Sequence, residues 1–212
     1  TTDSAQNPQL ATSIVVQGGT KVYDNKPATD ASTFKVLGPS QYTDFTIPTL
    51  DASDFDTTAI SQDAGSYQVT LNQTGLQALK DANKNYSFDA TDVQNGLYVI
   101  TPAPITITAP SETTVYTGTP VSVTTGTVTS DNTTLKATPD YTIAVNGNAQ
   151  DVGTYTTTVV PNAKGNENYK ITTVAGAITI TPAKQTAVIQ NATKAYDNST
   201  TDPTSYTVTL ST

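Results

Sequence analysis

The chain has 212 residues with ten basic and 18 acidic side chains, a net charge of −8, and no Cys, Met, Trp, His or Arg. An acidic chain without arginine offers no basic surface to phosphates or anionic lipid, so we expect no binding to nucleic acid or membranes. Without His or Cys there is no imidazole base, no thiol nucleophile and no ordinary zinc site, so we expect no enzymatic activity and no cofactor.

Residues 1–10 form a polar tract of Thr, Ser, Gln and Asn, which we interpret as a leader or linker. No signal peptide opens the chain and no run approaches the roughly 20 apolar residues of a membrane span. We therefore expect an internal segment of a longer extracellular protein. Threonine is the commonest residue, with 45 copies. Without periodicity this would indicate a disordered stalk, whereas strict alternation with apolar residues indicates solvent faces of β-strands.

Alternation favours strands. Residues 103–110 (APITITAP), 153–160 (GTYTTTVV) and 176–183 (GAITITPA) alternate apolar and polar side chains. In the second of these segments Tyr155 and Val159 share one face. Short alternating runs separated by Gly, Pro, Asn and Asp predict an antiparallel all-β protein with half-buried strands and thin cores.

One segment has a different period. Leu76, Leu79 and Ala82 recur every three residues among good helix formers. This spacing predicts a short helix over about 75–82, with its apolar stripe against a sheet edge or the bottom of a core.

Three motifs occur twice in the same order. They are D-x-G-x-Y at 63–67 and 151–155, N-x-N-Y at 83–86 and 166–169, and a closing strand ending in T-P-A at 96–103 and 176–183. A further tyrosine follows the opening strand of each copy and appears a third time near the end. The repeated signature residues are Tyr23, Gly65, Tyr67, Tyr86, Tyr116, Gly153, Tyr155, Tyr169 and Tyr196. We expect the repeated tyrosines to be core residues.

This order divides the chain into repeat one at 11–102, repeat two at 103–182 and the incomplete start of a third repeat at 183–212. The helix falls where repeat one is longer than repeat two, so it is an insertion in a shared β-scaffold. Proline after each closing strand stiffens the joints, which predicts a monomeric rod of domains. The last segment is too short to bury a core, so we expect its strands to fray or to pair with an exposed edge of repeat two or of a neighbouring molecule.

In D-x-G-x-Y the glycine permits a tight turn and the tyrosine can close the end of a sandwich. This is similar to the tyrosine corner of immunoglobulin-like domains. Seven or so short strands per repeat fit the same class, so the predicted fold is a tandem array of immunoglobulin-like β-sandwiches. A β-grasp domain is the alternative, but it needs a central helix, and repeat two has none.

The order of Y-D-N, D-x-G-x-Y, N-Y and I-T-P-A resembles the MBG repeats, which accompany mucus-binding modules in cell-wall-anchored surface proteins of lactobacilli and related Gram-positive bacteria. The resemblance covers residues 11–182 and the opening of the third copy. Repeat two departs from it with Tyr116-Thr117-Gly118 where the family often has Y-D. The resemblance implies a non-enzymatic adhesin or stalk segment on the extracellular surface, with host mucin, another glycoprotein or the extracellular matrix as partner.

Three further features have candidate chemistry. Asp81, Asn83, Asn85, Asp89 and Asp92 occupy positions 1, 3, 5, 9 and 12 of a calcium-loop pattern, but position 6 is Tyr86 where the loop needs glycine. Asp51, Asp54 and Asp56 could supply paired carboxylates, although a solvated acidic loop explains them as well. Lys21 and Lys194 recur at one repeat position, as a crosslinking lysine would, but repeat two has Thr114 there. We therefore expect no metal site and no shared crosslink.

Tyr42 occurs in repeat one only, within a predicted loop, and is the candidate for contacting a sugar ring. The leading hypothesis is a segment of a bacterial surface adhesin that presents, or contributes to, binding of host mucus or glycans. A pure spacer remains open, as does an accessory module of a secreted carbohydrate-active enzyme.

Overall fold

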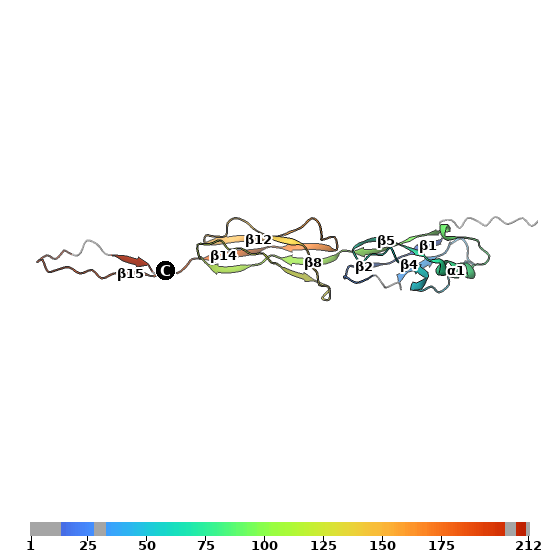
Figure 1. Cartoon of the computed structure of the whole chain (residues 1–212), viewed down its shortest axis with the longest axis horizontal. Helices are drawn as coiled ribbons and strands as arrows, with labels where there is room; N and C mark the ends of the chain where they lie inside the picture. The colour runs from blue at the N-terminus through green and yellow to red at the C-terminus, as the bar shows by residue number, and fades with distance from the viewer. Residues whose placement is uncertain (1–13, 28–32, 202–206, 211–212) are drawn as a thin grey trace, which may run out of the picture.

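Two β-domains lie end to end in the computed structural model, which describes residues 14–27, 33–201 and 207–210 (Figure 1). A β-hairpin extends beyond the second domain and makes the whole chain elongated. The expected leader at 1–10 lies outside the described residues.

Within the described residues, each domain has seven strands in two sheets. The strands of the first domain are β1 (Ile14–Gln17), β2 (Thr20–Val22), β3 (Lys35–Leu37), β4 (Phe55–Asp56), β5 (Gly65–Leu71), β6 (Val93–Gln94) and β7 (Gly96–Thr101). Those of the second are β8 (Ala103–Thr108), β9 (Glu112–Val115), β10 (Thr127–Ser130), β11 (Tyr141–Val145), β12 (Gly153–Pro161), β13 (Tyr169–Val174) and β14 (Gly176–Thr181).

The two domains have the same topology. The sheets of the first domain have the orders β3-β1-β6 and β2-β7-β5-β4, and those of the second have the matching orders β10-β8-β13 and β9-β14-β12-β11. The sequence motifs that occur twice therefore belong to two copies of one fold. Side chains from both sheets form the buried cluster of the first domain, as in a β-sandwich.

The expectation of purely antiparallel sheets is wrong, because the opening segment of each domain pairs in parallel. β1 pairs in parallel with β6 and β8 with β13, while β2 and β9 pair in parallel with the closing strands β7 and β14. The opening segment crosses from one sheet to the other and lies beside a strand that runs in its own direction. Alternation of side chains shows that a strand is half-buried, but not which strand lies beside it.

Glycine makes the crossing in the first domain close. A Cβ on Gly18 would lie 2.0 Å from the carbonyl oxygen of Leu97, and one on Gly96 would lie 2.3 Å from that of Val16. A side chain at either position would clash with backbone, so the two strands approach each other only because both residues are glycine.

The predicted alternation of side chains is confirmed in the second domain. In β14, Ile178 and Ile180 are buried while Thr179 between them is partly exposed. In β12, Thr157 is fully buried on the inner face, where its hydroxyl donates a 2.7 Å hydrogen bond to the carbonyl of Pro110. The hydroxyl is thereby satisfied, as burial of a polar group requires.

The helix of the first domain is α1 (Gln73–Ala82), which starts two residues earlier than predicted. Asn72 precedes it in an extended conformation, and its side chain accepts a 3.0 Å hydrogen bond from the N–H of Gly75. This N-cap determines where the helix begins. Leu79 is fully buried and Leu76 partly buried, whereas Ala82 is exposed. The helix follows β5, where the second domain has only the loop between β12 and β13.

The first domain also contains the one-turn 3₁₀ helices η2 (Ala52–Asp54) and η3 (Ala90–Asp92). They lead directly into β4 and β6.

One buried apolar cluster extends from the first domain into the second. It joins residues such as Ile14, Val69 and Ile100 to Ile105 and Ile107 of β8. A smaller cluster around Ile178 and Ile180 lies in the second domain. The domains are therefore in contact through buried apolar side chains as well as through the chain itself.

Residues beyond the second domain form a hairpin of β15 (Ala187–Ile189) and β16 (Val208–Leu210), with Ala187 opposite Leu210. Its large apolar side chains are exposed, including Ile189 and Leu210 at 67% each. The strands pair with each other, although 18 residues separate them in sequence, so the expectation that they fray or pair with an edge of the second domain is wrong. Pairing within the segment satisfies the backbone groups of both strands.

Candidate functional site: the corner between the two domains

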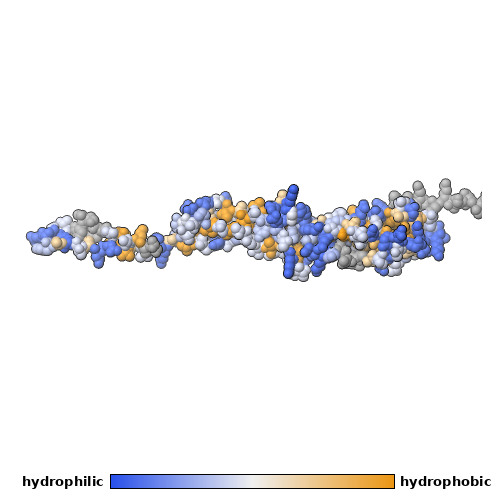
Figure 2. Space-filling view, in the orientation of Figure 1, coloured by the Kyte–Doolittle hydropathy of each residue, from blue (hydrophilic) through white to orange (hydrophobic). Residues whose placement is uncertain are grey.

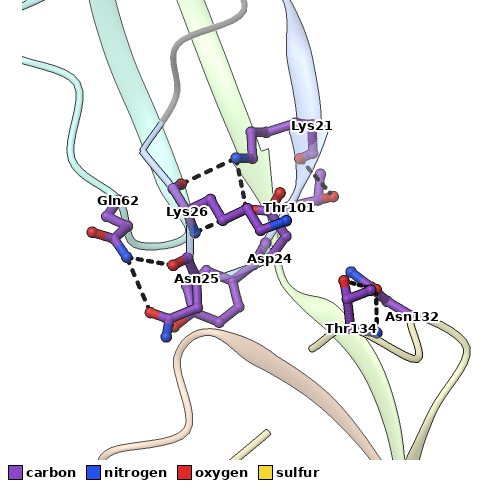
Figure 3. Close-up of polar contacts among 9 residues, drawn as sticks. Lys21, Asp24, Asn25, Lys26, Gln62, Thr101, Asn132 and Thr134 are labelled. Atoms are coloured by element: carbon purple, nitrogen blue, oxygen red, sulfur yellow. Dashed lines mark hydrogen bonds and ion pairs between the residues drawn. The ribbon is translucent and has the colours of Figure 1, made fainter. Parts of the chain in front are cut away.

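A turn with the sequence K-V-Y-D-N ends the opening segment of the first domain. Asn25 adopts the left-handed conformation with φ 57°. Lys21 Nζ lies 2.7 Å from Asp24 Oδ1, which also accepts a 3.0 Å hydrogen bond from the N–H of Lys26 (Figure 3). Desolvation raises the pKa of Asp24, but these contacts with Lys21 and Lys26 outweigh it and hold the pKa below its ordinary value.

The same turn forms again at the third copy. Lys194 Nζ lies 3.1 Å from Asp197 Oδ1, and Asn198 has φ 57°. Tyr196 donates its hydroxyl to the Asn198 side chain at 3.0 Å, as Tyr23 does to Asn25 at 3.1 Å. Because Tyr196 is 90% exposed, the turn does not depend on a surrounding core.

In the second domain the turn has the sequence Y-T-G. Gly118 occupies the left-handed position with φ 78°. Glycine and asparagine are the residues that adopt this conformation most readily, so Tyr116-Thr117-Gly118 replaces Y-D-N without changing the path of the backbone.

A glutamine ties this turn to the D-x-G-x-Y motif in both domains. Gln62 Nε2 donates to the carbonyl of Asn25 at 2.6 Å (Figure 3). Gln150 Nε2 donates to the carbonyl of Gly118 at 2.9 Å. Each glutamine directly precedes the motif. Sequence analysis missed this glutamine, although its repetition just before the motif could have identified it.

The tyrosine of the motif closes the same structure. The hydroxyl of Tyr67 donates to the carbonyl of Asp63 at 2.8 Å, and that of Tyr155 donates to the carbonyl of Asp151 at 3.0 Å. This is the backbone contact four residues upstream that a tyrosine corner predicts. We use "corner" below for the structure made by the tyrosine turn and the Q-D-x-G-x-Y segment.

An asparagine of the second domain forms hydrogen bonds with the corner of the first domain. Asn168 Nδ2 donates to Asp63 Oδ1 at 2.9 Å, and its Oδ1 accepts from the N–H of Ala64 at 2.7 Å. The backbone carbonyl of Asn168 accepts from the N–H of Ala103 at 2.9 Å, where the chain enters the second domain. Only Pro102 separates β7 from β8.

Two tyrosine rings pack across the same junction. The ring centroids of Tyr23 and Tyr169 are 5.8 Å apart at an interplanar angle of 87°, an edge-to-face contact. Tyr23 is only 6% exposed. Burial is the main reason that the pKa of Tyr23 is raised, with smaller contributions from Tyr169 and Asp63.

The expectation that the repeated tyrosines are core residues is correct for Tyr23 but wrong for Tyr116 and Tyr196, which are 40% and 90% exposed. Tyr116 has the same position in its domain as Tyr23. The difference is that the second domain covers Tyr23, whereas no described residues cover Tyr116 in the same way.

The first asparagine of N-x-N-Y acts within its own domain. Asn83 Oδ1 accepts from the N–H of Thr46 at 2.6 Å, and its Nδ2 donates to the carbonyls of Thr46 at 2.7 Å and Leu79 at 2.8 Å. Asn166 makes the corresponding bonds in the second domain, to both backbone groups of Asp140 and to the carbonyl of Asn162. This asparagine fixes the loop that carries the second asparagine and the tyrosine.

The residues of the calcium-loop pattern have separate partners. The buried side chain of Asn83 forms hydrogen bonds with backbone groups, and the carboxylate of Asp81 accepts a hydrogen bond from the side chain of Gln77. Asp89 and Asp92 form the capping box of η3. Asn85 is exposed and forms no hydrogen bond within the part of the chain that the structure describes. Hydrogen bonds from Thr91 lower the pKa of Asp89. Across residues 14–27, 33–201 and 207–210 no group of three or more carboxylates is placed to hold a metal ion.

The acidic run at 51–56 forms a similar cap. Asp51 accepts from the N–H of Ser53 at 2.8 Å, and Asp54 accepts from the N–H of Asp51 at 2.8 Å. Asp56 accepts from the N–H of Thr58 at 3.0 Å. These carboxylates stabilise turns and are not directed at one another.

Tyr42 is half-buried, and its ring centroid lies 5.3 Å from that of Tyr86. Tyr86 also packs on Phe45 and donates its hydroxyl to Asp44, and this hydrogen bond raises the pKa of Tyr86 to about 12. The hydroxyl of Tyr42 forms no hydrogen bond with the described residues. Whether Tyr42 contacts a sugar stays a prediction.

One surface hollow lies along α1 and is lined by side chains from Gln73 to Asp81. The described helix is too short and too polar to cross a membrane.

Comparison with known proteins supplies the family. The sequence model of the MBG domain matches residues 10–102. No curated protein matches the chain. Among solved structures, the chain is similar to a cell surface adhesin from Lactobacillus reuteri, with 30% sequence identity over 41% of this chain and 93% of that chain and a TM-score of 0.33. The chain therefore belongs to the MBG-domain family, with the matched domain at residues 10–102.

Proposed function

We propose that the chain is a non-enzymatic repeat segment of a bacterial cell-surface adhesin that presents, or contributes to, binding of host mucus or other glycoproteins. The MBG match at 10–102 and the second copy of the same topology at 103–181 support this role. The protein would then act outside the cell, attached to the wall of a Gram-positive bacterium.

The junction between the domains is the observation that carries the proposal. One residue links β7 to β8, Asn168 bridges to Asp63 and Ala64, and Tyr23 packs on Tyr169. A joint with this many contacts keeps the domains in line, as Figure 1 shows. A segment of domains held in line extends an attached surface away from the cell.

The surface suits a protein that works in water and among glycans. Polar residues cover most of the face in Figure 2, and the apolar patches between them are small. Threonines on the outer faces of the strands supply much of this polar surface, as Thr156 and Thr158 do in β12. Tyr42 offers a ring held by its neighbour and a hydroxyl available to a ligand, the combination that sugar contacts use.

Binding of the fragment to mucin tests the adhesive part. The chain of residues 1–212 is passed over immobilised mucin and a glycan array, together with the variants Tyr42→Phe and Tyr116→Phe. Tyr42→Phe removes the hydroxyl but keeps the ring packing, so we expect it to weaken binding. Tyr116→Phe also removes one tyrosine hydroxyl, at the corner of the second domain, and this variant should bind mucin as the parent does. If no mucin or glycan binds the parent, the fragment is a spacer and the adhesive role lies elsewhere.

A further inference from the structure

The second domain carries a corner that matches the covered corner of the first. Tyr116, Gln150 and Asp151 have the positions of Tyr23, Gln62 and Asp63, and the hydrogen bonds of the glutamine and of the motif tyrosine correspond in the two corners. The second corner lacks the Lys21–Asp24 ion pair and the hydrogen bond from Tyr23 to Asn25, because Thr114, Thr117 and Gly118 stand at those positions. The two corners share the glutamine and motif-tyrosine contacts, and they differ in what covers them.

The second corner has the same carboxylate and backbone N–H that Asn168 bonds in the first corner, but there they have no hydrogen-bond partner among the described residues. Asn168 bonds the carboxylate of Asp63 and the N–H of Ala64. Within the described part of the chain, the carboxylate of Asp151 and the N–H of Val152 form no hydrogen bond. An exposed acceptor and an exposed donor thus lie side by side, as they would at the first corner without Asn168.

Apolar surface is open at the second corner too. Tyr116 is 40% exposed and Val152 51%, whereas Tyr23 is 6% exposed under the second domain. An aromatic ring that packed on Tyr116 as Tyr169 packs on Tyr23 would bury this surface. Burial of apolar area and edge-to-face ring contact would both favour such a complex.

We propose that the corner formed by Tyr116, Asp151 and Val152 is a docking surface for the N-x-N-Y loop of another domain of this type, following the second domain along the polypeptide. The second asparagine of that loop would bond Asp151 and Val152, and its tyrosine would pack on Tyr116. The occupied corner of the first domain is the template for each contact.

The matching loop lies on the first domain as well, at the other end from its corner. Asn85 and Tyr86 correspond to Asn168 and Tyr169, and Asn85 is exposed. A domain with a corner at one end and a loop at the other makes a heterologous contact, which continues into a linear array instead of closing. This inference concerns assembly and holds whether or not the chain binds mucus.

An extended chain tests the proposal with every residue of the present chain retained. A second copy of 103–182 is inserted after Pro182, so that the new joint repeats the sequence at Pro102. The copy carries Tyr116→Phe, which leaves one Tyr116 to follow by tyrosine nitration and mass spectrometry. We expect nitration of Tyr116 to fall about sevenfold on extension, in the ratio of the exposed fractions 40% and 6%.

The matched control is the same extended chain with Asn168→Ala in the inserted copy, in which nitration of Tyr116 should return toward the level of the unextended chain. Tyr23 should stay protected in both, since its own junction is unchanged. Circular dichroism per residue equal to that of the parent shows that the copy has folded. If Tyr116 then remains as reactive as in the unextended chain, the proposal is wrong. Protection of Tyr116 by mucin alone, in the unextended chain, would assign the corner to the ligand and would also overturn it.

Discussion

Replacing Asn168 by alanine removes the amide that joins the two domains and leaves both domains otherwise intact. The side chain makes two hydrogen bonds across the junction, 2.9 Å to Asp63 Oδ1 and 2.7 Å from the N–H of Ala64. A neutral hydrogen bond contributes about 0.5–1.5 kcal/mol, and one to a charged group about 1.5–3 kcal/mol. Because Asp63 is exposed and screened by water, we expect the junction to lose about 2 kcal/mol in all.

The consequence is a larger population of molecules in which the domains have separated. A loss of about 2 kcal/mol raises the equilibrium constant for opening about 30-fold. Tyr23 is 6% exposed in the closed junction, so nitration of this residue reports the open state. We expect faster nitration of Tyr23 in Asn168→Ala, while nitration of Tyr116 stays constant as the internal reference.

Asn85→Ala is the matched control, because Asn85 has the same place in its own domain but makes no hydrogen bond among the described residues. A double-mutant cycle between Asn168→Ala and Asp63→Ala isolates the bond between the two side chains. Equal nitration of Tyr23 in the parent, Asn168→Ala and Asn85→Ala would show that the asparagine does not hold the junction closed, and would refute the reasoning.

Three further predictions concern the first domain, and each is checked by urea unfolding followed by circular dichroism. Asn83→Ala leaves three backbone groups without their partner and should cost about 2–4 kcal/mol, whereas Asn85→Ala should cost almost nothing; equal costs would contradict the role of Asn83. Leu79→Ala opens a cavity beneath α1 and should cost about 2–5 kcal/mol, and a loss under about 1 kcal/mol would mean that the helix is not anchored there. Hydrogen bonds from Ser53 and Thr91 lower the pKa of Asp51 and Asp89 in the folded state. The two ionised carboxylates therefore stabilise the folded state above the unfolded pKa of about 3.9, and this stabilisation is lost as the pH falls through the lowered folded pKa. The urea concentration at the unfolding midpoint should thus decrease as the pH is lowered from 5 to 3. The decrease should be smaller in a variant with asparagine at both positions, and an equal decrease in that variant would exclude these two groups as the cause.

Local sequence was a sufficient guide to the strands and turns. Alternation predicts that Ile178 and Ile180 face inward, because neighbouring residues of a strand point to opposite faces. The turn at 194–199 repeats the contacts of 21–26 although it has no core around it. Both turns combine an ion pair three residues apart with one residue that tolerates a positive φ, and these groups lie within the turn itself.

The start of α1 and the strand pairing were harder to predict. The helix begins at the cap formed by Asn72, whereas the apolar period becomes visible only at Leu76. The parallel pairing of β2 with β7 joins residues that are nearly 80 positions apart, such as Thr20 and Val99. Alternation within a strand is the same for parallel and antiparallel neighbours, so it could not distinguish them.

The candidate site shows the same division. The sequence by itself determined that the chain contains two copies of one fold with a tyrosine turn, a D-x-G-x-Y corner and an N-x-N-Y loop, because these features depend on short-range geometry and recur in order. Only the tertiary structure decided that Tyr23 is buried while Tyr116 is exposed, and that Asn83 acts within its domain while Asn168 acts across the junction. Residues at corresponding positions have the same local conformation, but their burial and hydrogen bonds depend on whether another domain lies against them.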